Sequence, residues 1–303
     1  MNIVIMGAGA IGSLFGAKLS KNNNVILIGR KPHVNVINKY GLKIQGKTNL
    51  NVSIEAFKSA KNAFVAPDLL ILAVKSYDTE VAMKATAPMI GDNTFVMSLQ
   101  NGLDNIEKIE KFVNRKKIMV CITTHGAIFS KPGFIKHTGI GKTILGALDV
   151  KNKQQIVTIS NIFNKSEIKT TISNDIIKDI WIKAIVNSSI NPLTALFNCK
   201  NGYILENPIL EKILDKICEE SSNIASSYGI DIDSSSIIRK TKEVIKDTCE
   251  NHSSMLQSVL NCKKTEIDSI NGKLVEIGKK QGNKTTMNEI LTYSVKTLNS
   301  SNS

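Results

Sequence analysis

The sequence predicts an α/β protein in which the first half forms an open parallel sheet and the second half is helical. A short apolar run at residues 2–6 leads directly into a glycine-rich turn, as in a strand–turn–helix unit. Further apolar runs at 68–74 and 94–99 predict buried parallel strands, and from about residue 168 the pattern changes to long helical segments. Because 303 residues exceed the usual size of one domain, we predict two, spanning 1–168 and 169–303.

The composition is that of an ordinary globular protein, with 42% hydrophobic and 21% charged residues. The net charge of +13 is spread along the chain without an arginine-rich arm, so it favours small anionic ligands over nucleic acid. Five scattered cysteines without a CxxC pair fit reduced thiols better than disulfides or a zinc site. The N-terminus has no signal-peptide pattern, and no apolar run has membrane-spanning length. We therefore expect a cytoplasmic protein without a membrane, nucleic-acid or metal partner.

The turn after the first strand matches G-x-G-x-x-G and predicts a dinucleotide site. An amphipathic helical pattern and a second apolar strand at 25–28 follow it. Gly7 allows the tight turn, Gly9 lets the backbone approach a pyrophosphate, and Gly12 permits close packing of the helix on the strand. The helix N-terminus then favours the negative phosphates. The expected cofactor contacts are Gly7, Ala8, Gly9, Ala10, Ile11 and Gly12, and a purely structural glycine turn is the alternative.

The end of the second strand indicates which nicotinamide cofactor is preferred. An acidic side chain there would accept hydrogen bonds from the ribose 2′-hydroxyl of NAD, but the sequence has Gly29-Arg30-Lys31. Arg30 is able to pair with a 2′-phosphate through charge-assisted hydrogen bonds. We therefore expect NADP(H) to be preferred over NAD(H), with a solvated basic turn as the alternative interpretation of Arg30.

Two polar residues follow the next apolar strands. Lys75 ends the run at 68–74, and Asn101 follows the run at 94–99. Because ligands of open α/β sheets collect beyond the carboxyl ends of the strands, both are candidates to contact the nicotinamide half of the cofactor. Either is otherwise an ordinary polar loop residue.

Residues 116–123 predict one more strand, and 133–141, with their glycines, predict a hairpin. Four isolated histidines, His33, His125, His137 and His252, show no metal-ligand spacing. We assign them structural or surface roles, with a catalytic role of His125 and His137 as the alternative.

The second half opens with a strongly helical segment at 175–187 that contains a polar stripe. Lys183, Asn187 and Asn191 recur at i, i+4 and i+8, which places them along one side of a helix in an apolar context. Buried polar groups are costly without partners, so the stripe predicts a pocket wall, with a solvated face as the alternative. Pro192 removes the helical bond to the Ser188 carbonyl, so we expect a kink or a helix end there.

Later helices are predicted at 208–228 and 234–249, and the residues 299–303 have the composition of a frayed tail. Taken alone, Ser254 is predicted to be a helix N-cap and Glu266 an exposed acid near a helix start.

These segments together resemble the ketopantoate reductase family across essentially the whole chain. The resemblance rests on GAGAIG at 7–12, AVK ending at Lys75, QNG holding Asn101, and TTHGA ending at Ala127. It continues in K-x3-N-x3-N-P-L-T from Lys183, in NCKNG at 198–202, in SSMLQ at 253–257 and in TEID at 265–268. The first motif is shared by many dehydrogenases, whereas the K-x3-N-x3-N-P-L-T block with the later SSML and TEID segments is specific.

The resemblance implies a fold, an activity and a set of residue roles. The fold is a doubly wound Rossmann-type N-terminal domain joined to an all-helical C-terminal domain, with the active site in the cleft between them. The activity is reduction of the keto acid 2-dehydropantoate (ketopantoate) to (R)-pantoate, towards pantothenate and coenzyme A, in a cytoplasmic homodimer. Lys183 would be the general acid, and Glu266 would orient Lys183 and the cofactor. The substrate would be bound by Lys183, Asn187, Asn191, Asn201 and Ser254, and the cofactor further by Arg30, Lys75, Asn101, Ala127 and Glu266.

Two rival hypotheses stay open on the sequence. An enzyme with the same plan would reduce another 2-keto acid or oxidise a 3-hydroxy acid. A non-catalytic NADP-binding sensor would need Lys183 or Glu266 to be lost or displaced, and both are present.

Overall fold

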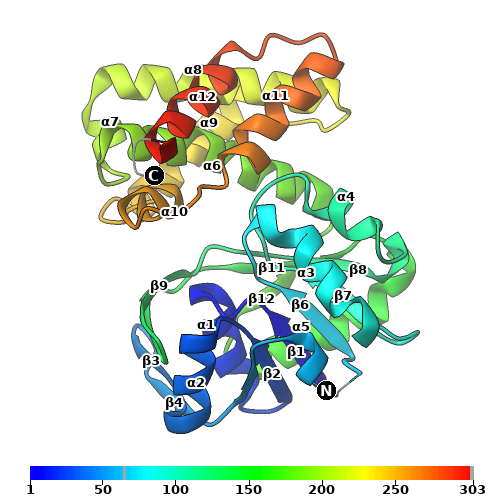
Figure 1. The fold of residues 1–303 in the computed structure, drawn as a ribbon. Helices are drawn as coiled ribbons and strands as arrows, with labels where there is room; N and C mark the ends of the chain where they lie inside the picture. Colours follow the sequence, from blue (N-terminus) through cyan, green and yellow to red (C-terminus); the bar gives the residue numbers. More distant parts are fainter. Residues whose placement is uncertain (64–65, 301–303) are drawn as a thin grey trace. The chain divides into compact units, whose positions relative to one another are not determined.

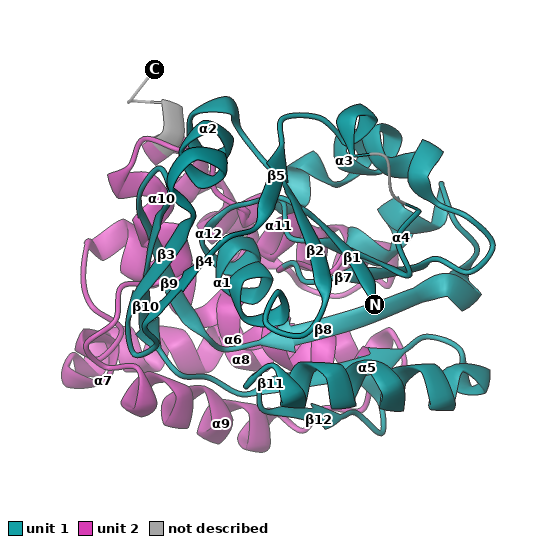
Figure 2. Cartoon of the chain, turned by 90° about the horizontal axis from the view of Figure 1, so that it is seen from below, with its two compact units in different colours: residues 1–100, 105–176 teal, residues 101–104, 177–303 magenta. Residues whose placement is uncertain are grey.

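The computed structural model describes residues 1–63 and 66–300 (Figure 1). The chain divides into a first unit, Met1–Gln100 with Asn105–Ile176, and a second unit, Asn101–Asp104 with Ile177–Ser303 (Figure 2). The first unit ends at Ile176 and not at the predicted residue 168, because strand β12 (Thr170–Ile172) pairs with β11 (Thr143–Ala147) in the sheet of this unit. Of the predicted tail, residues 299 and 300 belong to helix α12 (Thr286–Ser300), and 301–303 lie outside the described residues.

The larger sheet of the first unit has a strand order that reverses beside β1. Within the described residues its eight strands are, in spatial order, β12, β11, β8 (Ile118–Thr123), β7 (Phe95–Ser98), β6 (Leu69–Leu72), β1 (Asn2–Met6), β2 (Asn24–Ile28) and β5 (Glu55–Phe57). The strands from β5 to β8 are parallel, and β11 runs antiparallel to β8. The chain goes from β1 to β2 on one side and returns to β6 on the other. The carboxyl ends of β1 and β6 therefore form the switch point at which such sheets bind ligands.

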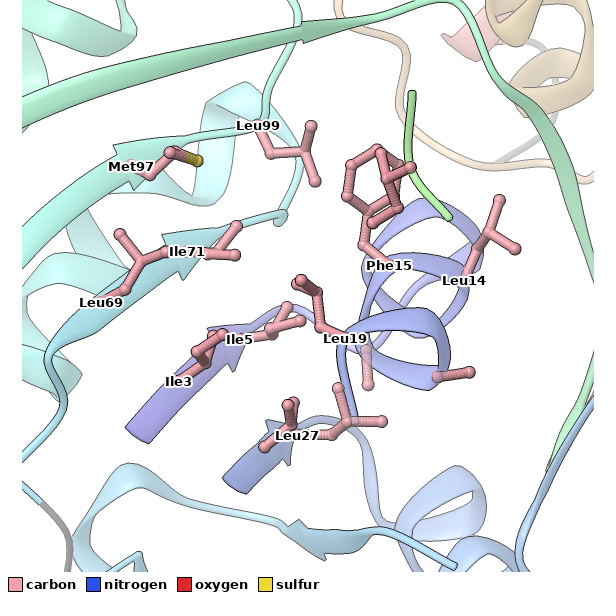
Figure 3. Close-up of a cluster of buried hydrophobic side chains, with 14 of the residues drawn as sticks. Ile3, Ile5, Leu14, Phe15, Leu19, Leu27, Leu69, Ile71, Met97 and Leu99 are labelled. Atoms are coloured by element: carbon pink, nitrogen blue, oxygen red, sulfur yellow. The ribbon is translucent and has the colours of Figure 1, made fainter. Parts of the chain in front are cut away.

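Successive side chains of the central strands point to opposite faces, and both faces are buried. One face, which includes Ile5, Leu27 and Ile71, packs against α1 (Ala10–Leu19) through Leu14 and Phe15 (Figure 3). Helix α5 (Lys153–Lys165) covers the same face. The other face packs against α3 (Thr79–Thr86) and α4 (Asn105–Glu110). Helices on both faces explain why the strands are apolar throughout, and they confirm the predicted α/β fold.

A smaller sheet covers the outer side of α1. Its strands are β4 (Leu50–Val52), β3 (Leu42–Gly46), β10 (Phe134–Gly139) and β9 (Gly126–Lys131), in that spatial order. Strands β9 and β10 form an antiparallel hairpin; of the residues 133–141 in which a hairpin was predicted, 134–139 form only its second strand, and its first strand lies earlier, at 126–131. Helix α1 contacts β9 and β10 as well as β1 and β2, so it lies between the two sheets. Helix α2 (Lys31–Tyr40) contacts β5 at the edge of the larger sheet.

Histidines connect this hairpin to its surroundings. His33 on α2 accepts a hydrogen bond at Nδ1 from the Gly133 N–H (2.9 Å), and its Nε2 lies 3.1 Å from Ser13 Oγ. His125 Nδ1 lies 3.1 Å from His137 Nε2, so these two histidines are not isolated. Burial lowers the pKa of His33 to about 4, and burial followed by the charge of His137 lowers the pKa of His125 to about 4. Both rings are neutral in the folded protein at neutral pH.

Acid is expected to unfold the protein through these histidines. Their folded-state pKa lies below the unfolded value of about 6.5, so the unfolded state binds more protons between pH 6.5 and 4. The free energy of unfolding should then fall with decreasing pH across this window, by up to ~1.4 kcal/mol per pH unit for each histidine. Urea denaturation at pH 7.5, 5.5 and 4.5 measures the slope. His33→Gln should reduce the dependence of the unfolding free energy on pH. An unchanged slope would show that His33 is not a source of the acid sensitivity.

The second unit is an all-helical bundle around α6 (Ile176–Phe197). Its other helices are α7 (Tyr203–Glu206), α8 (Pro208–Ser227), α9 (Ser234–Asp247), α10 (Ser254–Leu260), α11 (Asn271–Lys280) and α12. Buried Trp181 and Ile185 of α6 pack with Leu214 and Ile217 of α8 in the main core of this unit. The Trp181 ring also lies 5.2 Å from that of Tyr228 at the end of α8. The bundle thus surrounds the helix that carries the polar stripe.

Helix α6 continues for more than a turn beyond Pro192 and ends at Phe197. Of the predicted kink or helix end at the proline, the helix end is therefore wrong. A proline is tolerated inside a helix when the carbonyl that it leaves without a donor finds another one.

None of the helices in the described part of the chain is long and apolar enough to span a bilayer. All five cysteines are free thiols.

Candidate functional site

The glycine loop after β1 is shaped by close backbone approaches. Gly7 has a φ of 113°, and a Cβ placed there would lie 2.5 Å from the Val74 nitrogen. A Cβ on Gly12 would lie 2.1 Å from the Gly7 oxygen. A Cβ on Gly9, by contrast, would meet nothing within 4 Å. Nothing in the fold of the protein itself requires a glycine at position 9, and open space at this position fits the approach of a pyrophosphate.

The loop presents the start of α1 to this space. Gly9 is the N-cap of α1 and has no side chain to satisfy the first N–H groups of the helix. The Gly7 and Ala8 N–H groups both donate to the Ile28 carbonyl at 3.0 Å, which fixes the loop against β2. Ala10 and Ile11, half-buried, form the first turn of α1. Unpaired donors at a helix N-terminus favour a phosphate group, so these residues fit a dinucleotide.

Lys75 lies on the other side of the switch point. It follows β6 after Ala73 and Val74, and it is the N-cap of a short 3₁₀ helix, Ser76–Asp78. Gln100, just beyond β7, donates from Nε2 to the Val74 carbonyl (3.0 Å) and to Thr79 Oγ1 (2.8 Å). Gln100 thus holds the loop that carries Lys75. Gln100 was not among the predicted site residues, although a polar side chain directly after a buried strand was a usable signal.

Arg30 lies directly beyond β2 as the exposed N-cap of α2. Its neighbour Gly29 approaches the glycine loop so closely that a Cβ would lie 2.7 Å from Ala8 Cβ. Arg30 therefore stands next to the loop, where a cofactor's adenosine ribose is expected.

Ala127 is half-buried on β9, opposite His137 of β10, and thus belongs to the smaller sheet.

The polar stripe of α6 is only partly accessible to solvent. Lys183 and Asn187 are half-buried, and Asn191 is 6% exposed. The residues between them, 184–186 and 188–190, are all buried. The alternative of a broad solvated face therefore does not describe this helix.

Two further predicted residues lie in the turn that follows α6 and at the first position of α10. Asn201 is buried, and its Nδ2 donates to Thr248 Oγ1 at 2.9 Å. Within the described part of the chain its Oδ1, which is buried, has no hydrogen-bond partner, and such an atom is expected to receive a donor from a ligand or water. Ser254 is not the N-cap of α10, as predicted from position alone. Ser253 is the cap and accepts from the Leu256 N–H at 3.1 Å, so the exposed Ser254 side chain is not used for capping.

Glu266 and Asn101 lie together in the second unit. Glu266 is 6% exposed, so the alternative of an exposed surface acid is wrong. Asn101 Nδ2 donates to Glu266 Oε2 at 3.4 Å. The segment Asn101–Asp104 belongs to this unit because the Leu103 N–H donates to the Ser269 carbonyl (3.0 Å) and Ser269 Oγ donates to Asp104 (3.0 Å). The structure thus joins two predicted residues that are 165 positions apart.

Gly102 allows this segment to dock. Its φ is 101°, and a Cβ would lie 2.9 Å from both Cβ and the carbonyl oxygen of Ser269.

Among the described residues, no group of three His, Cys, Asp or Glu side chains is arranged as metal ligands.

Family models match both units of the chain. The model of the ketopantoate reductase PanE/ApbA matches residues 3–150, and the model of its C-terminal part matches residues 175–299. The chain belongs to the ketopantoate reductase family. A 2-dehydropantoate 2-reductase of Pyrococcus abyssi is 42% identical over 292 residues, which cover 96% of this chain and 95% of the relative. The corresponding enzyme of Pyrococcus horikoshii is 39% identical, with 98% and 97% covered.

Solved structures of related enzymes share the fold over the full length. The structure of a D-mandelate dehydrogenase with NADH and anilino(oxo)acetate has a TM-score of 0.95 at 28% identity, and 100% of this chain and 99% of that chain are covered. A ketopantoate reductase of Ralstonia eutropha JMP134 has a TM-score of 0.91 at 25% identity, with the same coverage. As a member of the ketopantoate reductase family, this protein is an oxidoreductase with a Rossmann-like sheet and a helical C-terminal part.

Proposed function

We propose that this protein catalyses the NADPH-dependent reduction of 2-dehydropantoate to (R)-pantoate, a step towards pantothenate and coenzyme A. The observation that carries the proposal is the 42% identity over 96% of the chain to a 2-dehydropantoate 2-reductase. It is supported by the half-buried Lys183 and the two asparagines that share its side of α6.

The first unit supplies the cofactor contacts in this proposal. Gly7, Gly9 and Gly12 shape the loop, and the N–H groups at the start of α1 hold the pyrophosphate. Lys75 and Ala127 contact the cofactor beyond the sheet. A bound nicotinamide supplies the hydride.

The second unit supplies the substrate contacts and the proton. Lys183 donates a proton from Nζ to the oxygen of the C2 ketone and stabilises the negative charge that develops there. Asn187 and Asn191 hydrogen-bond substrate oxygens from the same side of α6. The buried Asn201 Oδ1 accepts from a substrate hydroxyl, and the Ser254 hydroxyl donates to the substrate carboxylate.

Glu266 and Asn101 complete the proposed site. The buried carboxylate of Glu266 accepts from Asn101 and keeps Lys183 and the cofactor in orientation. A carboxylate with 6% exposure needs such partners, because an unpaired buried charge is strongly unfavourable.

Arg30→Ala is expected to weaken NADPH binding about tenfold or more and to change NADH binding little. The reason is that the exposed guanidinium beyond β2 pairs with a 2′-phosphate, which NADH lacks. Fluorescence titration of both coenzymes with the wild type and the variant measures this. Lys31→Ala, at the next position, is the matched control. Equal losses for NADPH and NADH would remove Arg30 from the 2′-phosphate site.

A substrate panel tests the function itself. The rates of NADPH and NADH oxidation are measured with ketopantoate, 2-ketoisovalerate and pyruvate. A strong preference for ketopantoate is expected, because the asparagines hydrogen-bond its hydroxyl group, which 2-ketoisovalerate and pyruvate lack. Equal turnover of all three, or turnover of none, would refute the proposed substrate.

A second candidate is the NADH-dependent reduction of another 2-keto acid. The observation that favours it is the TM-score of 0.95 to a D-mandelate dehydrogenase with bound NADH. The lower identity of 28%, against 42% to the 2-dehydropantoate 2-reductase, favours ketopantoate. Phenylglyoxylate, the 2-keto acid that corresponds to mandelate, belongs in the same panel with both coenzymes. We also propose that the protein is cytoplasmic and forms a homodimer. Sedimentation of the purified protein tests the dimer.

A further inference from the structure

One carbonyl of α6 cannot have its usual helical donor, because Pro192 lies four residues further along the helix. Proline has no N–H, so the Ser188 carbonyl oxygen loses the hydrogen bond that continues a helix. Ser188 has 0% exposure, and a buried carbonyl needs a partner. The side-chain Nδ2 of Asn271, at the start of α11, donates to this oxygen at 3.0 Å. Asn271 thus supplies the hydrogen bond that the proline removes, which explains why α6 continues past Pro192.

The orientation of the Asn271 amide is fixed by its neighbours. Glu220 on α8 accepts from the backbone N–H groups of Met287 and Asn288, at 2.9 Å each. Its carboxylate also accepts from Asn288 Nδ2 at 2.8 Å, which turns Asn288 Oδ1 towards Asn271. That oxygen accepts from Asn271 Nδ2 at 3.0 Å. Both N–H groups of the Asn271 amide therefore have acceptors, and a flipped amide would place its oxygen against both of them.

We propose that Asn271 is a positioning residue for the substrate-binding side of α6. The proposal rests on the proposed function, in which Asn187 and Asn191 bind the substrate. Ser188 directly follows Asn187, and Pro192 directly follows Asn191, so the carbonyl that Asn271 bonds belongs to the turn that joins the two asparagines. Without this donor the turn opens at Pro192, and the two amides no longer lie at helical spacing.

A double-mutant cycle between Asn271 and Pro192 tests the coupling without reference to activity. Asn271→Ala should lower the thermal unfolding midpoint by several degrees. Pro192→Ala restores an N–H to position 192, which is able to bond the Ser188 carbonyl. In that background Asn271→Ala should lower the unfolding midpoint by less than half as much as it does in the wild type. An equal decrease of the midpoint in both backgrounds would overturn the proposal. Asn271→Ser, whose side chain is too short to reach Ser188, carries the same cycle if the alanine variant does not fold.

Kinetics then separates positioning from a general structural role. Asn271→Ala should raise the KM for the 2-keto acid about tenfold, with the Kd for NADPH changed less than about twofold. The added Pro192→Ala substitution should recover at least half of that KM change on a logarithmic scale. Parallel losses of NADPH affinity and of kcat would show a structural effect and overturn the proposal.

Asn261→Ala is the matched control. Its amide also donates to a helix carbonyl, that of Gln257, but on the exposed end of α10, so its effects should be independent of Pro192. If the wild type reduces no 2-keto acid, the proposed function fails. The unfolding cycle still decides whether Asn271 replaces the missing N–H.

Discussion

Lys183→Ala should lower kcat for ketopantoate by about 10²- to 10⁴-fold, the range in which a positioned general acid contributes to catalysis. Lys183 is the proposed proton donor to the oxygen of the reduced ketone, and it is half-buried on α6 among buried residues. Its partly desolvated ammonium stabilises developing negative charge more strongly than water does. Removal of this group affects the transition state more than the ground state, so kcat should fall more than KM rises.

The same variant should keep its affinity for NADPH, because the proposed cofactor contacts of Lys75 and of the glycine loop lie in the other unit. Single-turnover kinetics and NADPH titration measure the two effects separately. Lys178→Ala is the control, since Lys178 lies on the same helix but five residues earlier and therefore on a different side. A kcat within about threefold of the wild type would show that Lys183 is not the acid.

The sequence was sufficient for those parts of the fold that depend on local patterns. The central strands of the larger sheet, β1, β2, β6, β7 and β8, are short apolar runs because both of their faces are buried, so their positions follow from hydrophobicity. The glycine loop was predictable because Gly7 and Gly12 are required by backbone approaches that always accompany this strand–turn–helix unit. The stripe on α6 followed from helical periodicity.

Contacts between distant residues were not predictable in this way. Of the kink or helix end expected at Pro192, the helix end did not occur, because Asn271 donates to the Ser188 carbonyl. This donor lies 83 residues after Ser188, so the local pattern could not reveal it. The four histidines were treated as isolated, yet His125, in the connection between β8 and β9, shares a hydrogen bond with His137 of β10. The local sequence pattern predicted that Glu266 is an exposed acid, whereas in the structure it is buried beside Asn101. A pattern in one segment gives no information about which side chain of another segment will face it.

Gly9→Ala is expected to reduce the affinity for NADPH at least about tenfold while the thermal stability is unchanged or slightly higher. A Cβ at this position meets no protein atom within 4 Å, and the φ of −81° suits any residue. The folded protein therefore tolerates alanine, which also restricts the unfolded chain. The added methyl group instead occupies the space at the start of α1 through which a pyrophosphate approaches the backbone.

Gly91→Ala is the matched control for this prediction. Gly91 is exposed, and a Cβ there also meets nothing within 4 Å, but it lies in the turn before β7, away from the glycine loop. Both variants should therefore unfold like the wild type in calorimetry, and only Gly9→Ala should lose NADPH affinity in titration. An unchanged Kd in Gly9→Ala would mean that the pyrophosphate does not use this space, and the loop would then be a structural turn. A loss of both stability and affinity would instead point to a contact within the folded chain. Because Gly9 has no such contact in this structure, a selective loss of affinity identifies the loop as a binding element.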